Sequence, residues 1–441
     1  MFSVGTQVTS PLRMTHSLTT LSEVLNVMDV RGGAAGQESQ FATRVIGSPL
    51  APLVFSLHEE DLLKIFSFLS LSDLLHVSRV CRWWYKLSFD RVLWKDIDLR
   101  RFASRLTDSA KMELLVFKRL SARIRCLDLS GFTVSDRTLS ILASSCKQLR
   151  VLKLKSVTFT KGSQTDDLKG KEVFPDHLKY LDIRLSQGHC NVYRAIASSL
   201  SNIKQLGLCD AVLYTQIQNG SLKTTIESME NLRKLDLSHC RLLSDNNLAL
   251  FARCRKLELL SVRKCILLAG SFVQNFLQSC TLLKTLILDG ISIDDDTLQN
   301  IGWEGSKLTH LELGWCPLIT SYGLNAVLPQ MAKISSLEYL GLCATGDSKA
   351  VNDETLVKLE TILPSRLTKK LKWLNISCSR SITKNGLRAL HSLNSLVEIL
   401  DTTNCPEIES FRNVQTCDRN NDVSNSKVKG IIFNYSLDTP V

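Results

Sequence analysis

A nine-residue pattern of leucines recurs along most of the chain. Its clearest copy runs from Leu232 to Cys240 and reads L-x-x-L-x-L-x-x-C. Leu235 and Leu237 alternate along the chain, so both point to the same face of a short strand. The residues that follow place apolar side chains at roughly helical spacing, at Leu243, Leu248, Leu250 and Phe251. The pattern therefore predicts one short strand and one helix in each copy.

Copies of this pattern recur at a nearly constant spacing. Their starts are Ile124, Leu149, Leu178, Ile203, Leu232, Leu257, Leu283, Leu308, Leu337, Leu371 and Leu396. Successive starts lie 25, 29, 25, 29, 25, 26, 25, 29, 34 and 25 residues apart, which is the signature of leucine-rich repeats. Because one strand and one helix cannot bury their apolar sides alone, we predict that the copies stack. The expected fold is an α/β leucine-rich-repeat solenoid, a horseshoe with parallel strands on the concave face and helices outside.

Length and composition agree with a stack of repeats. The chain has 441 residues, too many for one compact core, whereas a solenoid has no such size limit. Hydrophobic residues make up 44% and charged residues 22%, as in ordinary globular proteins. No run of about 18 uncharged apolar residues occurs, so we expect no membrane span. The first residues lack a basic start followed by an apolar stretch, so we expect no secretory signal and a cytoplasmic or nuclear location.

The 14 cysteines follow the repeat. One set lies eight residues after a repeat start and comprises Cys240, Cys265 and Cys316. Another set lies three residues before the next start and comprises Cys146, Cys254 and Cys280. No C-x-x-C pair occurs, and a buried thiol behaves as a small apolar group, so we predict free, packed cysteines in a reducing compartment. The alternative is a disulfide or a metal site.

The positive charge is concentrated in the first half of the repeats. The net charge of +11 comes from 54 basic and 43 acidic residues. Residues 124–264 carry 22 basic and 13 acidic side chains, whereas residues 265–411 carry 12 and 15. The first half should therefore attract anions. Solubility explains this charge better than nucleic-acid binding, because the chain has no Lys/Arg block and no nucleic-acid-binding motif.

Residues 53–99 form a separate apolar and aromatic segment, after a Ser-, Thr- and Gly-rich stretch at 1–52 that we interpret as a flexible tail. Apolar residues fall at helical spacing at Leu62, Ile65, Phe66 and Leu69, and again at Leu74, Leu75, Val77 and Val80. Ser72 or Asp73 is suited to cap the second helix, and a third helix is predicted from near Cys81. Three short helices make a marginal core, so part of this apolar surface should meet another protein.

The same segment resembles the F-box. The pattern of that family is Leu-Pro, a helix with Leu, Ile and Phe, a Leu doublet, Val-Cys-x-x-Trp and Leu-Trp. The matching residues are Leu57, Leu63, Ile65, Phe66, Leu69, Leu74, Leu75, Val80, Cys81, Trp84, Leu93 and Trp94. The sequence departs from the pattern at His58, where the family has the proline that starts the first helix. An F-box followed by leucine-rich repeats is the arrangement of the F-box/leucine-rich-repeat class, and the resemblance covers residues 53–411.

This resemblance implies a role in protein degradation. It implies that the F-box docks on the Skp adaptor, and through it on the cullin and RING subunits, of a Skp–cullin–F-box ubiquitin ligase. It also implies that the repeats hold a protein substrate for ubiquitination. The residues assigned in this way to adaptor binding are Leu57, Leu63, Ile65, Phe66, Leu69, Leu74, Val80, Trp84 and Trp94. Half of the matching residues are expected to be helical core instead, and the sequence does not separate the two sets.

Three further segments complete the predicted organisation. Residues 100–123 place Ala110, Leu114, Phe117 and Leu120 on one face of a helix, which we predict to be a packed linker that caps the first repeat. The repeats occupy residues 124–411, with polar insertions at 158–176 and 344–353 that should form loops. Residues 412–441 are predicted to form a C-terminal tail or a final cap.

The predicted strands define two candidate substrate surfaces. The third residue of each repeat points to the concave face and is stacked across strands that lie about 4.8 Å apart. In three consecutive repeats this residue is aromatic or His, at His310, Tyr339 and Trp373, with Trp315 just past the first strand. An exposed aromatic row is typical of binding hot spots, although the rings could instead cover one another. The second surface is basic, could pair with an acidic or phosphorylated peptide, and comprises Lys153, Lys155, Arg184, Arg263 and Lys264.

No catalytic motif is recognisable. The chain has no G-x-S-x-G, no phosphate-binding glycine loop and no H-E-x-x-H, so we predict a binding protein without a cofactor. Asp294, Asp295 and Asp296 are better explained as a helix start than as a metal site, because carboxylates stabilise helix N-termini. Two alternatives to a ligase subunit remain. One is a scaffold whose F-box-like part has lost adaptor binding through His58, and the other is a ligase-independent binder of acidic partners, of the ribonuclease-inhibitor sort.

Overall fold

The computed structural model describes residues 57–103, 124–160, 174–188, 201–218, 220–364 and 371–408. The chain divides into two units, and the boundary falls between Leu93 and Trp94. The predicted tails at 1–52 and 412–441 lie outside the described residues. So does the predicted linker helix at Ala110, Leu114, Phe117 and Leu120.

The described residues of the first unit contain three helices, as the spacing of the apolar residues predicts. They are α3 (Glu59–Phe66), α4 (Leu71–Val77) and α5 (Arg82–Ser88). The prediction of Ser72 or Asp73 as the cap of α4 was wrong. The side chain of Ser70 accepts a hydrogen bond from the backbone N–H of Asp73 at 3.2 Å. Ser70 is therefore the cap, and the helix begins directly after it, at Leu71.

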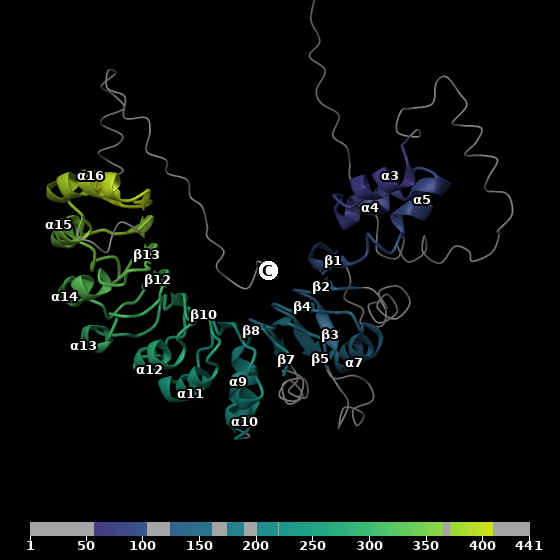
Figure 1. Ribbon diagram of the computed structural model, residues 1–441, viewed down its shortest axis with the longest axis horizontal. Coiled ribbons are helices and arrows are strands. Elements are labelled where there is room, and N and C mark those ends of the chain that lie inside the picture. Colours follow the sequence, from purple (N-terminus) through teal and green to yellow (C-terminus); the bar gives the residue numbers. More distant parts are fainter. Residues whose placement is uncertain are drawn as a thin grey trace, which may run out of the picture. The chain divides into compact units, whose positions relative to one another are not determined.

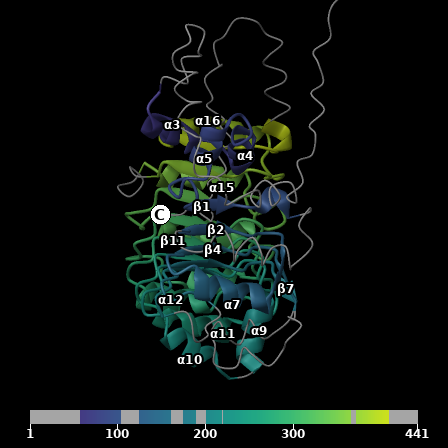
Figure 2. The same ribbon diagram turned by 90° about the vertical axis from the view of Figure 1, so that its right-hand side faces the viewer.

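The second unit is built on a parallel sheet of twelve strands (Figures 1 and 2). The strands are β1 (Asp96–Asp98), β2 (Cys126–Asp128), β4 (Val151–Lys153), β6 (Tyr180–Asp182), β8 (Gln205–Gly207), β9 (Lys234–Asp236), β10 (Leu259–Ser261), β11 (Thr285–Ile287), β12 (His310–Glu312), β13 (Tyr339–Gly341), β14 (Trp373–Asn375) and β15 (Ile399–Asp401). Each strand pairs with the strand of the preceding repeat. The helices lie on the outer side of the strands (Figure 1). This arrangement confirms the predicted solenoid.

The helical segments follow the strands. They are α7 (Asp136–Ser145), α9 (Asp210–Gln218), α10 (Leu222–Glu227), α11 (Asp245–Ala249), α12 (Phe272–Ser279), α13 (Asp295–Asn300), α14 (Ser321–Met331), α15 (Asp353–Ile362) and α16 (Leu387–Leu396), with 3-10 turns η2 (Arg100–Phe102), η4 (Leu250–Arg253) and η6 (Lys384–Gly386). A small second sheet contains β3 (Thr133–Ser135), β5 (Thr158–Thr160) and β7 (Gln187–Gly188). The Asp294 side chain accepts the backbone N–H of Thr297 at 2.8 Å, so the acidic run is a helix start, as predicted.

The leucine pattern places the strands to within one residue. In the first ten predicted repeats the strand begins two residues after the start. The eleventh start was wrong by one residue, because β15 begins at Ile399 and the buried residue at the first position is Val397 rather than the exposed Leu396. Cys405 then lies eight residues after the start, as Cys240 and Cys265 do.

The sheet also begins earlier than Ile124. Strand β1 pairs with β2, with Ile97 opposite Leu127, so it is an additional first repeat. The sequence Trp94-Lys95-Asp96-Ile97-Asp98-Leu99 carries the same spacing as the other copies, with Trp94 in the place of the first leucine. Residues 96–98, which we included in the F-box segment 53–99, therefore belong to the sheet of the second unit.

The turn after most strands has the same geometry, and β1 and β8, which are followed by helical turns, are the exceptions. In these turns the eighth residue of the repeat adopts the left-handed conformation, with φ +67° at His239, +58° at Lys264 and +57° at Trp315. Its N–H donates to the carbonyl of the next repeat, as Trp315 does to Cys343 at 2.8 Å. The ninth residue carries the cysteine column, and its thiol donates back to the preceding repeat, as Cys265 does to the Leu237 carbonyl at 3.0 Å. Buried cysteines are thus part of the stacking between repeats.

The predicted loops differ in how far the structure describes them. Residues 161–173 of the first insertion lie outside the described residues. In the second, Ala344, Thr345, Ala350 and Val351 are buried. This second loop is therefore packed into the solenoid and does not form a free surface.

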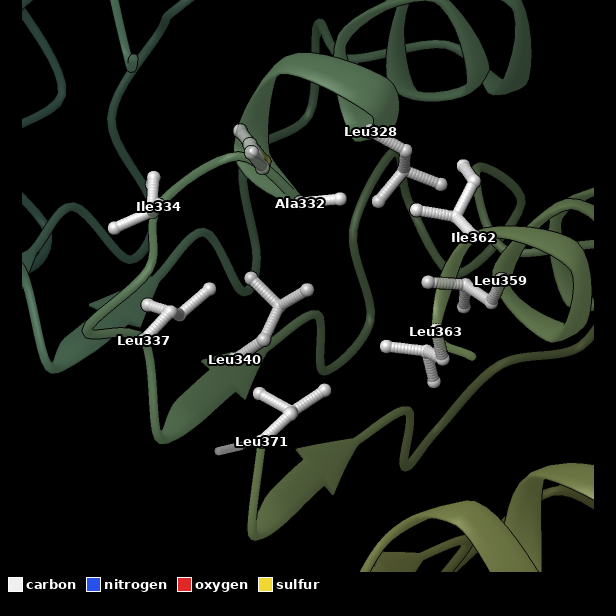
Figure 3. Close-up of a pocket in the computed structure, with 10 residues that line it drawn as sticks. Leu328, Ala332, Ile334, Leu337, Leu340, Leu359, Ile362, Leu363 and Leu371 are labelled. Atoms are coloured by element: carbon white, nitrogen blue, oxygen red, sulfur yellow. The ribbon is translucent and has the colours of Figure 1, made fainter. Parts of the chain in front are cut away.

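An apolar pocket lies between α14, α15 and the strands beneath them (Figure 3). Its cavity volume is about 30 Å³, it is partly open to solvent, and Ala332 points into it among leucine and isoleucine side chains. Replacing Ala332 with leucine should fill part of this space and stabilise the repeat unit by about 0.5–2 kcal/mol. The midpoint of thermal unfolding measures this effect. Ala269→Leu, at an exposed position, is the control and should leave the midpoint unchanged, whereas a lower midpoint for Ala332→Leu would show that the pocket is too small.

Candidate functional site

Two surfaces follow from the geometry, one in each unit. In the first unit the core consists of Leu62, Leu74 and Leu87 together with Phe66, which packs edge-on against Trp84 with ring centroids 5.4 Å apart. Phe66 and Leu74 were predicted to contact an adaptor, and that prediction is corrected here. Both side chains are buried between the helices, because each is needed to close a core that three short helices share.

Five large apolar side chains are exposed in the part of the first unit that the structure describes, and they are Leu57, Ile65, Phe68, Val80 and Val92. Three of them, Leu57, Ile65 and Val80, belong to the predicted adaptor set. The side chain of Phe68 is 83% exposed. Phe68 was not in the predicted adaptor set because it does not lie on the helical face that marks the core. Leu63, Leu69, Trp84 and Trp94 are half-buried.

In the second unit the strand register brings the predicted aromatic row together. His310 pairs with Tyr339, and Tyr339 pairs with Trp373. The imidazole of His310 stacks on the Tyr339 ring at 3.9 Å between centroids, with an interplanar angle of 19°. The rings of Tyr339 and Trp373 lie 6.2 Å apart and are tilted by 45°. The row exists as predicted, and its members contact one another.

His310 is not part of the exposed surface, which corrects its predicted role. Its side chain is 2% exposed and lies beneath Tyr339, while its Nε2 lies 2.9 Å from Oε1 of Glu312. Burial lowers the pKa of His310 to about 3, against the opposite effect of Asp289, so the imidazole is neutral and donates its Nε2–H to Glu312. A larger neighbour about 4.8 Å away covers the smaller ring, which the sequence spacing alone does not show.

Arg263 is engaged within the molecule. Its guanidinium forms ion pairs of 3.0 Å with both Asp289 and Glu312. Burial and the nearby Glu312 raise the pKa of Asp289 well above its usual range. The predicted role of Arg263 as a cation available to a ligand is therefore corrected, because acidic side chains of the next two repeats already bind its guanidinium. Lys264, the next residue, is exposed.

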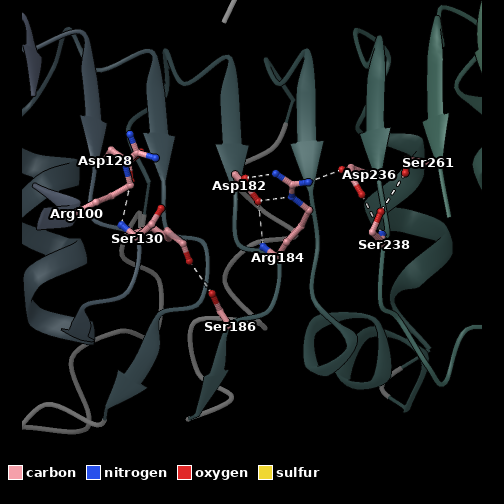
Figure 4. A network of polar contacts seen from close by, with 10 residues as sticks. Arg100, Asp128, Ser130, Asp182, Arg184, Ser186, Asp236, Ser238 and Ser261 are labelled. Atoms are coloured by element: carbon pink, nitrogen blue, oxygen red, sulfur yellow. Dashed lines mark hydrogen bonds and ion pairs between the residues drawn. The ribbon is translucent and has the colours of Figure 1, made fainter. Parts of the chain in front are cut away.

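Arg184 is also removed from the basic surface (Figure 4). Its side chain is buried and forms ion pairs with Asp182 at 2.7 Å and with Asp236 at 2.5 Å. The two carboxylates lie on strands that flank β8, where Gly207 is the residue opposite both of them. Because Gly207 has no side chain, the guanidinium has room between the two carboxylates.

The remaining predicted contact residues are accessible. Tyr339 and Trp373 are half-buried, and Trp315 is 58% exposed in its left-handed turn position. A left-handed conformation is costly for a bulky side chain, so Trp315 is held there by the backbone hydrogen bonds of the turn. Together Tyr339, Trp373, Trp315 and Lys264 form the accessible part of the predicted substrate surface.

The comparisons with known proteins agree with this architecture. The model of the F-box-like family matches residues 59–100. F-box/LRR-repeat protein 12 of Mus musculus is 24% identical over 305 residues, which cover 58% of this chain and 90% of the mouse protein. The protein of the same name from Homo sapiens is 25% identical over 345 residues, 78% of this chain and 79% of the human protein. The chain therefore combines an F-box-like domain with leucine-rich repeats.

One solved structure similar to this chain is that of the yeast Rad7 and Elc1 complex. It matches with a TM-score of 0.41 and 16% identity, over 77% of this chain and 94% of the other. Within the described residues, no helix has the length and apolar character needed to cross a membrane. The same residues contain no group of three or more His, Cys, Asp or Glu side chains that could hold a metal ion.

At the start of α3 the backbone already has the conformation that proline requires. His58 has φ −68°, within the range to which proline is restricted, and its side chain makes no capping hydrogen bond. The following Glu59, Glu60 and Asp61 place negative charge in the first turn of α3, which stabilises a helix start. His58 therefore does not loosen the start of the helix.

We expect His58→Pro to stabilise the F-box-like domain by about 0.4–1 kcal/mol, because proline reduces the entropy of the unfolded chain without changing the folded backbone. The midpoint of thermal unfolding is the measurement. Lys64→Ala, at an exposed position later in the same helix, serves as the control and should leave the midpoint nearly unchanged. A lower midpoint for His58→Pro would mean that the backbone N–H of His58 makes a bond that proline removes.

Proposed function

We propose that this protein is the substrate-recognition subunit of a Skp–cullin–F-box ubiquitin ligase. In this role the F-box-like domain binds the Skp adaptor, and the repeats bind a protein substrate. The role is non-catalytic, because the chain would position the substrate while other subunits form the bond to ubiquitin.

The exposed apolar side chains of the F-box-like domain carry this proposal. A unit of three short helices leaves Ile65, Phe68 and Val80 in water, although its own core is small. Exposed apolar side chains that gather on so small a unit are typical of a protein–protein interface. The similarity to F-box/LRR-repeat proteins supports the Skp adaptor as the partner.

Affinity purification of the full chain tests the proposal. The Skp adaptor and a cullin should co-purify with the full chain in comparable amounts. If the repeats retain binding partners while adaptor and cullin are absent, the protein is a ligase-independent binder instead, and the proposed function is wrong.

The accessible aromatic residues of the repeats support a substrate surface. Tyr339 rests on the buried His310 and also receives a hydrogen bond from the Asn375 amide at 3.5 Å, so its ring is held from two sides. Preformed, half-exposed aromatic rings lose little entropy on binding. His310 supports this surface from below and does not contact the substrate.

Replacing both Tyr339 and Trp373 with alanine should reduce substrate capture more than tenfold, because aromatic hot spots contribute about 2 kcal/mol or more each. Adaptor binding should be unchanged, since the F-box-like domain is not altered. Quantitative mass spectrometry of proteins bound to the full chain measures both effects. Tyr322→Ala, an exposed aromatic residue of α14, is the matched control. Unchanged capture by the double variant would contradict the aromatic surface.

A further inference from the structure

Exposed apolar side chains of the repeat unit gather in one structural position. Among its described residues, eleven large apolar side chains are exposed. Six of them lie in the turn that follows a strand, at the eighth to eleventh residues of a repeat, and they are Leu185, Leu242, Ile266, Leu267, Trp315 and Leu318. These four positions are a small part of a repeat of about 26 residues, so chance does not explain the concentration.

The backbone makes this exposure permanent. In two adjacent repeats the ninth and twelfth residues, Cys240 with Leu243 and Cys265 with Leu268, are fully buried and fill the core. The residues between them must therefore point outward. A backbone hydrogen bond holds the turn in this conformation, since the N–H of His239 donates to the Arg263 carbonyl at 2.7 Å.

Two adjacent repeats combine this apolar surface with positive charge. Leu242, Ile266 and Leu267 are each more than half exposed, and Arg241 and Lys264 beside them are exposed as well. We call these five residues the rim patch. No ion pair joins Arg241 or Lys264 to a carboxylate of the described residues, in contrast to Arg263.

Two carboxylates next to the same turns accept backbone hydrogen bonds. Asp210 accepts the backbone N–H of Leu242 at 3.1 Å, and Asp245 accepts those of Ala269 and Ser271 at 2.9 and 2.6 Å. The pKa of His239 is lowered, first by burial and then by Lys264, Arg241 and Arg263, against the opposite effect of Asp236. Arg241 and Lys264 therefore act as positive charges on a neighbouring side chain.

The concave face next to the rim patch offers little by comparison. Leu259, Thr285, Ser261 and Ile287, on strands β10 and β11, are all buried. A partner that approaches these repeats meets the turns first, with their exposed leucines and unpaired cations.

We propose that the rim patch binds a protein segment that carries both apolar and acidic side chains. Apolar side chains of the segment cover Leu242, Ile266 and Leu267, and its carboxylates pair with Arg241 and Lys264. The inference rests on the proposed function only in taking this segment to be part of the substrate. Its chemistry follows from the patch: the apolar surface supplies affinity, and the two cations select for negative charge.

A random twelve-residue peptide library displayed on phage tests this proposal with the full chain as the target. Peptides that combine Asp or Glu with Leu, Ile, Val or Phe should be enriched at least tenfold over the starting library. Leu242→Ser combined with Leu267→Ser should abolish this enrichment. Tyr322→Ser combined with Val357→Ser, which removes two large side chains that are each more than half exposed elsewhere, should preserve it.

Charge reversal gives a second, independent arm. Arg241→Glu combined with Lys264→Glu alters only exposed side chains and should shift the enriched peptides from acidic to basic. No enrichment, or enrichment that persists in the Leu242 and Leu267 variant, would overturn the proposal, as would acidic selection by the charge-reversed variant. Adaptor co-purification from the same preparations reports on the proposed function separately, so the two can fail independently.

Discussion

Replacing Arg184 with methionine should destabilise the repeat unit by about 3–5 kcal/mol. The guanidinium lies between Asp182 and Asp236, and both carboxylates are about 1% exposed. Methionine has a similar length but carries no charge, so two buried carboxylates would remain next to each other without a cation. The cost is large because water cannot replace the missing partner.

The midpoint of urea denaturation, followed by circular dichroism, measures this effect. Arg253→Met is the matched control, since Arg253 pairs with Glu227 where both side chains are about half exposed. Exposed pairs of this kind contribute about 0–1 kcal/mol, so the control should change the midpoint little. Similar shifts for both variants would mean that Arg184 is more accessible to water than its contacts indicate.

Replacing Ile65 and Phe68 with serine should weaken binding of the Skp adaptor more than tenfold. Both side chains are exposed in the isolated domain, with Phe68 the more exposed. Burying an aliphatic or aromatic side chain of this size contributes about 1.5–3 kcal/mol each, and tenfold in affinity corresponds to about 1.4 kcal/mol. Because neither side chain belongs to the core, the domain should stay folded.

Calorimetric titration of the purified adaptor into the full chain measures this affinity. The control, Tyr322→Ser, removes an exposed aromatic side chain from the repeats and should leave adaptor binding unchanged. The thermal unfolding midpoint of the Ile65 and Phe68 variant confirms that it is folded. If this folded variant binds the adaptor as tightly as the unaltered chain, the exposed apolar surface is not the adaptor site.

The repeat pattern predicted the strands because it is a local property. Leucines at fixed spacing must share one face, and the register of His310, Tyr339 and Trp373 follows from aligning the copies. The two errors have local signals as well. Cys405 marks Val397 as the last start, and Trp94 with Ile97 and Leu99 marks the first.

Exposure could not be predicted in the same way. His310 and Arg184 occupy positions that point to the concave face, yet both are buried. The residues that bury them lie on other repeats. The Tyr339 ring stacks on His310, and the absence of a side chain at Gly207 leaves space for Arg184. Phe66 and Ile65 are adjacent in sequence and apolar alike, but only the packing of three helices makes one core and the other surface.

The sequence by itself determined that this chain is a stack of strand-and-helix repeats preceded by three small apolar helices. That follows because spacing decides which side chains share a face. Only the tertiary structure decided which cations are already paired, which rings are covered, and which leucines of the turns stay in water. Those properties depend on contacts between side chains of different repeats, and the spacing of residues within one repeat does not determine the distances between them.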